Sequence, residues 1–297
     1  MNGSVIDHTD APAVRALRVP VVPSPAWDIA VNKTREGFLK REEARLTLST
    51  LRAEFADHFG LGAVDRPYAD QGQARRFAVN MSNLRGRLDV EPYAPQYMKI
   101  RSELLGRGGC KLREIADVVR PSSRYKTAYV QEAAFGIPLL NGRQIAQYKP
   151  IGLRLMNVSG FKEPDSFRLQ PGTTLLTADG RAEENLADCS LVTRDRVGWG
   201  ASGHVHRVIP RRQRDAGLVY LACSCAAVQA QLKSLSTGSV VDALSEGDVG
   251  NVVVPFDDST AAKELGERAV LAWEAFASAV EAEARAVTAI EDAIREA

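Results

Sequence analysis

The chain has 297 residues, 45% of them hydrophobic, and a formal net charge of +1 at pH 7. This length and composition predict one or two globular domains with cores of their own. No window of 18 residues is apolar throughout, so no transmembrane helix is expected, and the first residues lack the basic and apolar regions of a secretory signal. Four cysteines in a chain of this length indicate a reducing compartment. We therefore expect a cytoplasmic protein without membrane contact.

The beginning of the chain repeats a segment near its end. With a fixed offset of 235, seven of the nineteen pairs from residue 3 to residue 21 are identical. A repeat at a constant offset indicates a duplicated structural unit. We interpret residues 1–24 as the tail of a unit whose front part is missing. The identical residues of the first copy are Gly3, Ser4, Val5, Asp7, Val14, Val19 and Pro20.

A long helical pattern follows each copy of the repeat. Ser24 is a good N-cap for a helix over residues 25–60, and Asp258 or Ser259 is a good cap for a helix over residues 258–297. Each pattern of about 35 residues would span roughly 50 Å as an α-helix. The matched lengths favour two spacer helices packed as an antiparallel coiled-coil pair, although two unrelated surface helices are the alternative. The apolar side chains expected to be buried include Trp27, Phe38, Phe55, Trp273, Phe276 and Val280.

Between the helices the sequence predicts a connector over residues 61–99 and a mixed α/β domain over residues 100–257. Residues 111–119 have the pattern of a short amphipathic helix, and residues 216–235 that of a longer one. The expected fold class is therefore α+β, with one mixed α/β domain and two long helices. Strand patterns separated by turn signals cover residues 136–140, 151–158, 173–178, 189–197 and 203–210.

Charge is unevenly distributed along the chain. Residues 100–256 contain 20 Lys and Arg against 15 Asp and Glu, a net +5. Residues 257–297 contain 4 against 10, a net −6. A basic block suits a polyanion such as nucleic acid, whereas the acidic last helix is expected to be a solvated face.

Motifs of enzymatic catalysis are not visible in the sequence. It has no phosphate-binding glycine loop, no dinucleotide fingerprint and no N-P-P-Y-type signature of an adenine methyltransferase. Asp179, Glu183 and Glu184 lie in one segment, which we interpret as a solvated loop. No catalytic residue and no cofactor is predicted.

A zinc site is also not expected, although two residue pairs raise the question. His204 and His206 would share a face of a strand, but Cys223 and Cys225 on a helix would point in different directions. Zinc sites usually have two to four residues between paired cysteines. We expect Cys225 in the core and His204 at the surface or facing DNA.

The order of several segments resembles the specificity subunit of Type I restriction–modification systems. The resemblance extends along almost the whole chain and depends on the ordered set, because no single motif is sharp. The matching segments are FAVNMSNLRGRLDVEPYAPQYMKIRSELL leading into KLREIADVV, then GIPLLNGRQI, PGTTLLTADG, VGWGASGHVHRVIP and QAQLKSLSTGSVVDALSEGDVGNVVVP, followed by the long helix.

The resemblance implies separate roles for the recognition domains and the long helices. In that family two target recognition domains alternate with two long antiparallel helices, and each domain reads half of a split DNA site. It implies here a non-catalytic, DNA-binding specificity subunit that directs an adenine methyltransferase (M) subunit and a restriction (R) subunit to double-stranded DNA. Two other interpretations stay open, namely a recognition module of another modification or phage-defence complex and an enzyme with an unrecognised site.

This sequence departs from the family in one respect. The resemblance makes residues 1–24 the tail of a first recognition domain and residues 100–257 a complete target recognition domain. It therefore implies a half-length form. A homodimer or a complementary half-specificity subunit would restore two recognition domains.

Three polar segments contain residue types that contact DNA: residues 141–149, 198–204 and 207–214. Lys and Arg contact phosphates, whereas Arg, Asn and Gln bond two atoms of one base edge. The respective alternatives are an ordinary polar hairpin, a tight turn and a solvated basic loop. The candidate DNA-binding residues are Arg143, Gln144, Lys149, Trp199, Ser202, His204, Arg211 and Arg212.

Overall fold

The computed structural model describes residues 11–18, 21–62, 77–84, 87–120, 128–159, 161, 164–237 and 242–296. Residues 3–10 of the repeat and much of the predicted connector lie outside this range. The chain divides into two compact units, one of residues 1–39 with 279–297 and the other of residues 40–278. No helix among the described residues is long and apolar enough to cross a bilayer.

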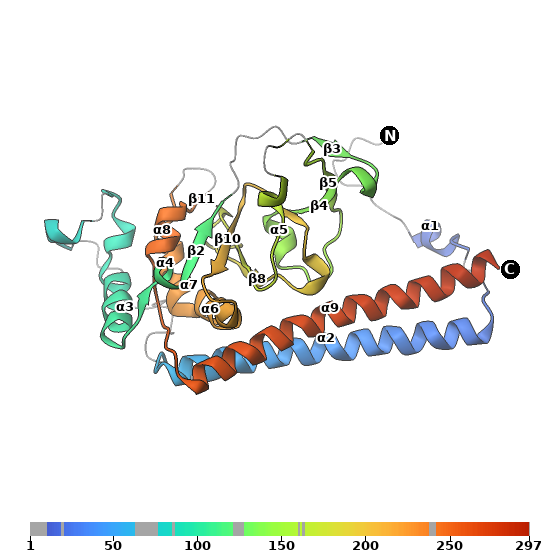
Figure 1. Cartoon of the computed structure of the whole chain (residues 1–297), viewed down its shortest axis with the longest axis horizontal. Coiled ribbons are helices and arrows are strands. Elements are labelled where there is room, and N and C mark those ends of the chain that lie inside the picture. The colour runs from blue at the N-terminus through green and yellow to red at the C-terminus, as the bar shows by residue number, and fades with distance from the viewer. Residues whose placement is uncertain are drawn as a thin grey trace. The chain divides into compact units, whose positions relative to one another are not determined.

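Two long helices run antiparallel to each other, α2 (Ser24–His58) and α9 (Thr260–Arg295) (Figure 1). The Ser259 hydroxyl accepts a hydrogen bond from the Ala262 amide at 3.1 Å, so Ser259 caps α9. Within residues 40–278, Arg268 of α9 binds the Glu54 carboxylate of α2, with one N–O distance of 3.1 Å. The predicted antiparallel pair of long helices is confirmed.

Small residues line the seam between α2 and α9, which corrects part of the predicted apolar stripe. Trp27 and Phe38 are 56% and 51% exposed, so the prediction that they are buried is wrong. Phe55 and Trp273 are buried as predicted. A Cβ atom on Gly37 would lie 3.1 Å from the carbonyl oxygen of Ala279, so the backbones are too close for large side chains between them. The buried small residues of the pair include Ala30, Ala44, Ala279, Ala282 and Ala286.

Two four-stranded sheets organise the unit of residues 40–278. In the first sheet the strand order is β2 (Ala116–Val119), β10 (Val205–Pro210), β6 (Thr174–Thr177) and β8 (Cys189–Leu191), with all neighbours antiparallel. In the second sheet the order is β3 (Tyr129–Val130), β5 (Arg154–Met156), β4 (Ile137–Leu140) and β9 (Gly200–Ala201), and the β4–β9 pair is parallel. Two further pairs join β1 (Cys110–Lys111) to β12 (Val253–Val254) and β7 (Asp179–Gly180) to β11 (Asp242–Ala243).

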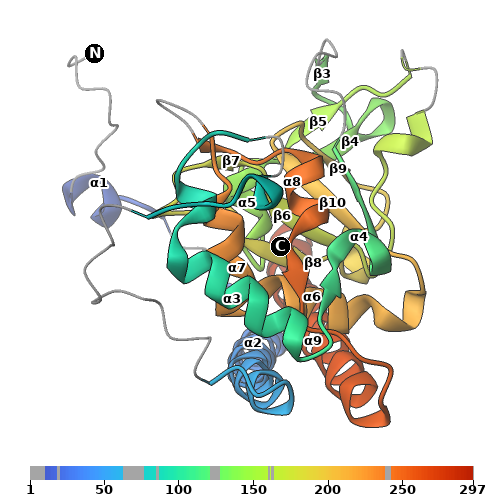
Figure 2. The same ribbon diagram turned by 90° about the vertical axis from the view of Figure 1, so that its left-hand side faces the viewer.

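Short helices cover and connect these sheets. They are α3 (Pro95–Gly106), α4 (Leu112–Ile115), α5 (Gly142–Ile145), α6 (Ala216–Ser224), α7 (Ala226–Ser234) and α8 (Glu246–Asn251). Helix α1 (Ala11–Arg15) belongs to the smaller unit. Single 3-10 turns lie at Met81–Asn83, Glu91–Tyr93, Ala133–Phe135, Pro164–Phe167, Arg194–Arg196 and Gln213–Asp215. Helices α3, α4 and α8 gather at one end of the larger unit, the end that faces the viewer in Figure 2.

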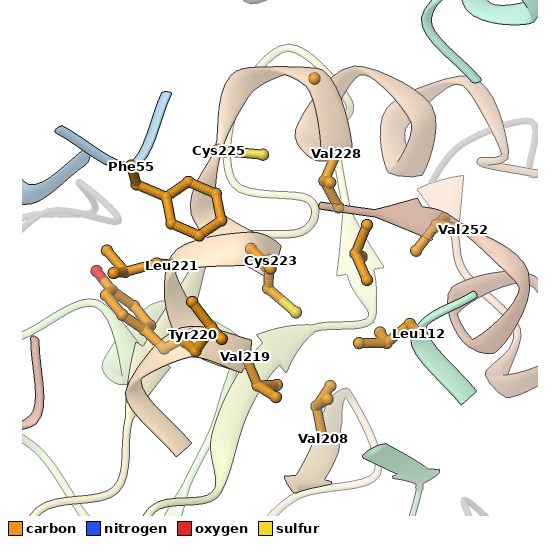
Figure 3. Close-up of a cluster of buried hydrophobic side chains, with 14 of the residues drawn as sticks. Phe55, Leu112, Val208, Val219, Tyr220, Leu221, Cys223, Cys225, Val228 and Val252 are labelled. Atoms are coloured by element: carbon orange, nitrogen blue, oxygen red, sulfur yellow. The ribbon is translucent and has the colours of Figure 1, made fainter. Parts of the chain in front are cut away.

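The main core lies around α6, whose residues 216–223 are all buried. A Cβ atom on Gly217 would lie 1.8 Å from the carbonyl oxygen of Gly266 in α9, so the two helices meet backbone to backbone. Side chains from the long helix α2, the sheet and both flanking helices close the cluster. Figure 3 shows Phe55, Leu112, Val208, Val219, Cys223, Cys225, Val228 and Val252 within it.

Two predicted helices are different in the structure. Residues 111–119 form α4 and then strand β2, because Val118 and Val119 pair with β10 instead of continuing the helix. The helix predicted over residues 216–235 is divided into α6 and α7 at Cys225, which has an extended backbone. The Gln229 side chain donates a hydrogen bond to the Cys223 carbonyl at 2.8 Å. This carbonyl would otherwise lack a hydrogen-bond partner where the helix is interrupted.

The predicted strands are present but shorter. Residues 189–197 contain only β8 before the chain turns at Arg194–Arg196, and residues 151–158 contain β5. Residues 203–210 contain β10, the longest strand of the described residues. Together these observations confirm the α+β fold class, with one mixed domain and two long helices.

Candidate nucleic-acid interface

A cleft of about 660 Å³ opens where β6 ends and β10 begins. Because these strands are antiparallel, with Thr177 opposite Val205, residues after β6 meet residues before β10. Helix α5 begins against the same point, where the Thr177 hydroxyl donates to the Gly142 carbonyl at 3.5 Å. We call this site the α5 cleft. It is lined by Asn141, Gly142, Arg143, Gln144, Gln147, Ile151, Asp179, Gly180, Arg181, Glu184, Asn185 and His204.

The carboxylate of Asp179 binds both Arg120 and His204 at one side of the α5 cleft. Its Oδ2 atom lies 2.6 Å from Arg120 Nη2 and 2.6 Å from His204 Nδ1. Arg120 Nε also donates to the Gly203 carbonyl. Asp179 is therefore paired and half-buried, so its assignment to a solvated loop is wrong, whereas Glu183 and Glu184 are exposed as predicted. The pairing leaves the Asp179 charge neutralised within the cleft.

Two side chains of the α5 cleft are available to a ligand. Among the residues that the structure describes, Arg143 and Asn185 make no side-chain hydrogen bond or ion pair. Arg143 is exposed on α5, and Asn185 is half-buried in the loop after β7. Arg181 is exposed and lies 3.6 Å from Glu184, a weak surface pair. The cleft thus presents a free guanidinium and a free amide, the two groups best suited to base edges.

Gln144 lines the α5 cleft, and its side chain also supports the local backbone. It is only 7% exposed, and its amide donates to the Ile151 carbonyl at 2.8 Å. Its Oε1 atom accepts from the Asn141 amide at 3.2 Å. Both ends of the side chain are occupied, so the structure assigns it to shaping the loop over residues 141–151. Lys149 is exposed but is not among the residues that line the cleft.

The buried guanidinium of Arg196 holds the end of α5 in place. It donates to the carbonyls of Ile145 at 3.4 Å, Gln147 at 2.5 Å and Tyr148 at 2.9 Å. Burial lowers the pKa of Arg196. Three carbonyls fixed by one side chain give the segment that carries Arg143 a defined position. Sequence inspection missed this residue because its role depends on contacts about fifty positions away.

Trp199 and Ser202 are not among the residues that line the α5 cleft. Trp199 is half-buried against the second core cluster, which contains Leu169 and Val205. The Ser202 hydroxyl accepts from the His204 amide at 3.3 Å. These two residues therefore position the turn that carries His204. His204 itself is exposed and lines the cleft, as predicted for a surface residue.

Arg211 and Arg212 lie at the opposite end of β10 from His204, and both are paired. Arg211 lies 3.3 Å from Asp117. Arg212 binds Asp258 at 2.8 Å and Asp215 at 2.6 Å, and these carboxylates raise its pKa. The structure thus brings Arg143, Gln144 and His204 together at the α5 cleft. It leaves Arg211 and Arg212 outside the cleft.

No group of three His, Cys, Asp or Glu residues is placed to hold a metal ion within the described part of the chain. His206 is buried, and its Nε2 donates to the Leu244 carbonyl at 2.9 Å, whereas His204 faces outward. Burial raises the pKa of the Cys189 thiol to about 12, and that of Cys223 is also raised. Neither thiol is a nucleophile near neutral pH.

Sequence inspection missed Arg120, Arg181 and Asn185 as residues of the site. Arg181 and Asn185 lie in one loop after β7, whereas Arg120 follows β2, and the pairing of β10 with both β6 and β2 brings these two segments together. Strands β6 and β10 were expected from the sequence. Had they been aligned as antiparallel neighbours, the segment after residue 178 would have been placed beside His204.

No family model matches the sequence, and no curated protein matches it. Among solved structures, ten chains are similar. One is the HsdS subunit from Thermoanaerobacter tengcongensis, at 14% identity and a TM-score of 0.40, with 99% of this chain and 64% of that chain covered. Another is the Type I restriction–modification S subunit from M. genitalium, at 14% identity and a TM-score of 0.32, with 50% and 33% covered. Both are subunits of the kind that the sequence resembles. This chain spans less than two thirds of the length of either.

Proposed function

We propose that the chain is a sequence-specific DNA-recognition subunit of a Type I restriction–modification complex, carrying one complete recognition domain and no catalytic site. The observation that carries the proposal is the α5 cleft, which presents the free guanidinium of Arg143 and the free amide of Asn185 side by side with His204 and Arg181. The ordered sequence resemblance and the pair of long helices support the same assignment.

In this proposal the α5 cleft reads base edges. An arginine bonds O6 and N7 of guanine, and an asparagine bonds N6 and N7 of adenine. Arg143 lies on a short helix whose following loop is fixed by Arg196, so its position is set before DNA binds. Such preorganisation lowers the entropy cost of recognition. His204 and Arg181 lie at the same cleft and would contact the phosphate backbone.

The long helices have a different role in this proposal. Residues 257–297 have a net charge of −6, which disfavours contact with DNA phosphates. We assign to α2 and α9 the spacing of half-sites and the docking of the methyltransferase subunit, which in turn recruits the restriction subunit. Apolar side chains exposed on α2, such as Phe38 and Leu46, favour a protein partner over nucleic acid.

Binding of duplex DNA by the chain together with its methyltransferase tests the proposal. Arg143→Gln is compared with Arg211→Gln, since both arginines are exposed and belong to the same compact unit. Loss of a bidentate base contact should relax preference at one base pair by about 1–3 kcal/mol, roughly a 5- to 150-fold change in affinity for the cognate site. Arg211→Gln should leave site preference unchanged.

Two results would contradict the proposal. One is equal behaviour of the Arg143 and Arg211 variants on cognate and altered sites. The other is methylation of DNA by the purified chain with S-adenosylmethionine and no partner, which would make the chain an enzyme.

A further inference from the structure

One large apolar side chain stands among the polar residues of the α5 cleft. Ile151 lines the cleft and is 72% exposed. Apart from two glycines, the other described residues that line the cleft carry charged groups, amides or an imidazole. A single exposed apolar residue is common at protein surfaces and by itself indicates nothing. What distinguishes Ile151 is the way in which its backbone is held.

Glutamine side chains fix the backbone of Ile151 on both sides. The Ile151 amide donates to Gln147 Oε1 at 3.1 Å, and the Ile151 carbonyl accepts from Gln144 Nε2 at 2.8 Å. Gln144 is buried and is itself held, because its Oε1 atom accepts from the Asn141 amide at 3.2 Å. Two side chains of the α5 segment are therefore occupied in holding one exposed residue.

The neighbours of Ile151 in the chain restrict the loop further. Pro150 precedes it and has a fixed φ. Gly152 follows it with a φ of 65°, a left-handed conformation that residues other than glycine rarely adopt. The buried Arg196 guanidinium also holds the Gln147 carbonyl at 2.5 Å. Ile151 thus has a defined position before any ligand binds, which lowers the entropy cost of a contact.

The chemistry of an isoleucine side chain limits what it can contact on DNA. Phosphates are bound by Lys, Arg and polar donors, and base edges are read by paired donors and acceptors. Isoleucine has neither, so it gains free energy only by removing apolar surface from water. The C5-methyl group of thymine is the apolar group that a base edge presents in the major groove.

The polar residues of the same cleft indicate the major groove. Arg143 suits O6 and N7 of guanine, and Asn185 suits N6 and N7 of adenine, and all these atoms lie in that groove. The thymine methyl group lies in the same groove. Insertion of an apolar wedge between base steps is the alternative, but such wedges are typical of proteins that bind the minor groove. The cleft therefore favours the methyl contact.

We propose that Ile151 is a specificity-determining residue that contacts the C5-methyl group of one thymine in the recognised site. Gln144 and Gln147 are its positioning residues. The inference rests on the proposed function and adds a base that the cleft reads, because Arg143 and Asn185 suit purines whereas the methyl group marks a thymine.

Duplexes that differ only in this methyl group test the proposal. The chain, together with its methyltransferase, first selects its site from a library of random duplexes. Each thymine of the selected site is then replaced in turn by deoxyuridine, which lacks the methyl group. With the wild type, deoxyuridine at one position should weaken binding roughly fourfold, the value for one buried methyl group.

Variants assign this effect to Ile151. Ile151→Ala should bind the thymine and deoxyuridine duplexes equally at that position, whereas Ile151→Val should keep a difference of about twofold or more. Gln147→Ala should also reduce the difference, because it frees the Ile151 amide. Leu105→Ala is the matched control and should keep the full difference, since Leu105 is 47% exposed in α3 and does not line the cleft.

Three results would overturn the inference. A selected site in which deoxyuridine at no position weakens binding removes the methyl contact. An unchanged difference in Ile151→Ala assigns the methyl group to another residue. An equal loss on both duplexes in Ile151→Ala means that the side chain inserts between base pairs or contacts another protein.

Failure of the proposed function has a different signature. If no sequence is selected from the library, or if the Arg143 and Arg211 variants behave alike, the chain does not read DNA through this cleft, and the inference falls with the proposed function. A selected site with equal affinities for the thymine and deoxyuridine duplexes contradicts the role of Ile151 alone.

Discussion

Arg41 of α2 donates a hydrogen bond to the hydroxyl of Tyr148 at 2.9 Å, and its guanidinium carbon lies 4.9 Å from the centroid of the Tyr148 ring. The same ring lies 6.5 Å from that of Phe276 in α9. Tyr148 ends the loop that Arg196 fixes and that begins at Arg143. The segment proposed to read DNA is thus attached directly to the helix pair proposed to carry the partner subunits.

Removal of the Tyr148 hydroxyl should weaken this attachment without disrupting the ring contacts. We expect Tyr148→Phe to lower the free energy of unfolding by about 0.5–1.5 kcal/mol, the usual value of one hydrogen bond. Tyr148→Ala should cost more and should also weaken DNA binding, because the Arg143 segment loses its anchor. Tyr129→Phe is the control, since Tyr129 lies under Arg154 at 5.0 Å but is half exposed. Equal urea midpoints for both Tyr→Phe variants would contradict the expected role.

Replacement of Arg196 should be among the most damaging single changes in the larger unit. Arg196→Met leaves three carbonyls without their buried donor, each at about 1–3 kcal/mol. We expect a loss of at least about 2 kcal/mol in chemical denaturation, with weaker DNA binding at temperatures where the variant is folded. Arg214→Met is the matched control, because Arg214 is 61% exposed. A variant at position 196 as stable as this control would show that other contacts fix the loop.

The backbone contact between α6 and α9 leaves no room for a methyl group. In Gly217→Ala the new Cβ atom would lie 1.8 Å from the Gly266 carbonyl, so the helices must separate. The expected loss is about 1–3 kcal/mol or more, the range for overpacked cores. Gly247→Ala, in α8, is the control because its nearest neighbour would be 3.9 Å away. Similar melting temperatures for the two variants would argue against direct contact of the backbones.

Stability should fall when the pH is lowered from 7 toward 5, because of His206. Burial lowers the pKa of His206, and its Nδ1 has no partner among the described residues while Nε2 donates to Leu244. The unfolded state therefore takes up a proton below about pH 6.5, and the folded state resists it until a lower pH. The stability that neutral His206 contributes is therefore fully present above the ordinary histidine pKa, and it is lost as the pH falls toward the lower pKa of the folded state.

His206→Gln should remove most of this dependence while keeping a donor for the Leu244 carbonyl. The measurement is urea unfolding of both proteins at pH 7.0 and 5.5. Carboxylates whose pKa is lowered by ion pairs, such as Glu54 with Arg268, titrate below this window. Parallel slopes for the two proteins between these pH values would assign the effect to another group.

The local periodicities of the sequence determined the elements of the fold. The spacing of apolar residues predicted both long helices, and Ser259 caps α9 as expected. Alternating or β-branched runs predicted the strands β4, β6 and β10. Local patterns are sufficient here because caps, turn residues and periodicity act over only a few positions. The fixed offset of 235 likewise indicated a duplication in the sequence.

Only the tertiary structure decided which surfaces of those elements are buried. Trp27 and Phe38 are exposed because α2 and α9 approach through Gly37 and alanines, and sequence patterns give too little weight to small residues. Residues 116–119 form a strand because their backbone pairs with β10. This ladder of hydrogen bonds between strands stabilises the segment more than a short isolated helix would.

The site was also decided by tertiary contacts. Composition predicted Arg143 and His204, but not that Gln144 is committed to the Ile151 carbonyl or that Arg212 is held by Asp258 and Asp215. Whether an arginine is free for a ligand depends on which carboxylates the fold brings beside it. That distance is set by strand pairing over tens of residues, and a sequence read locally does not contain it.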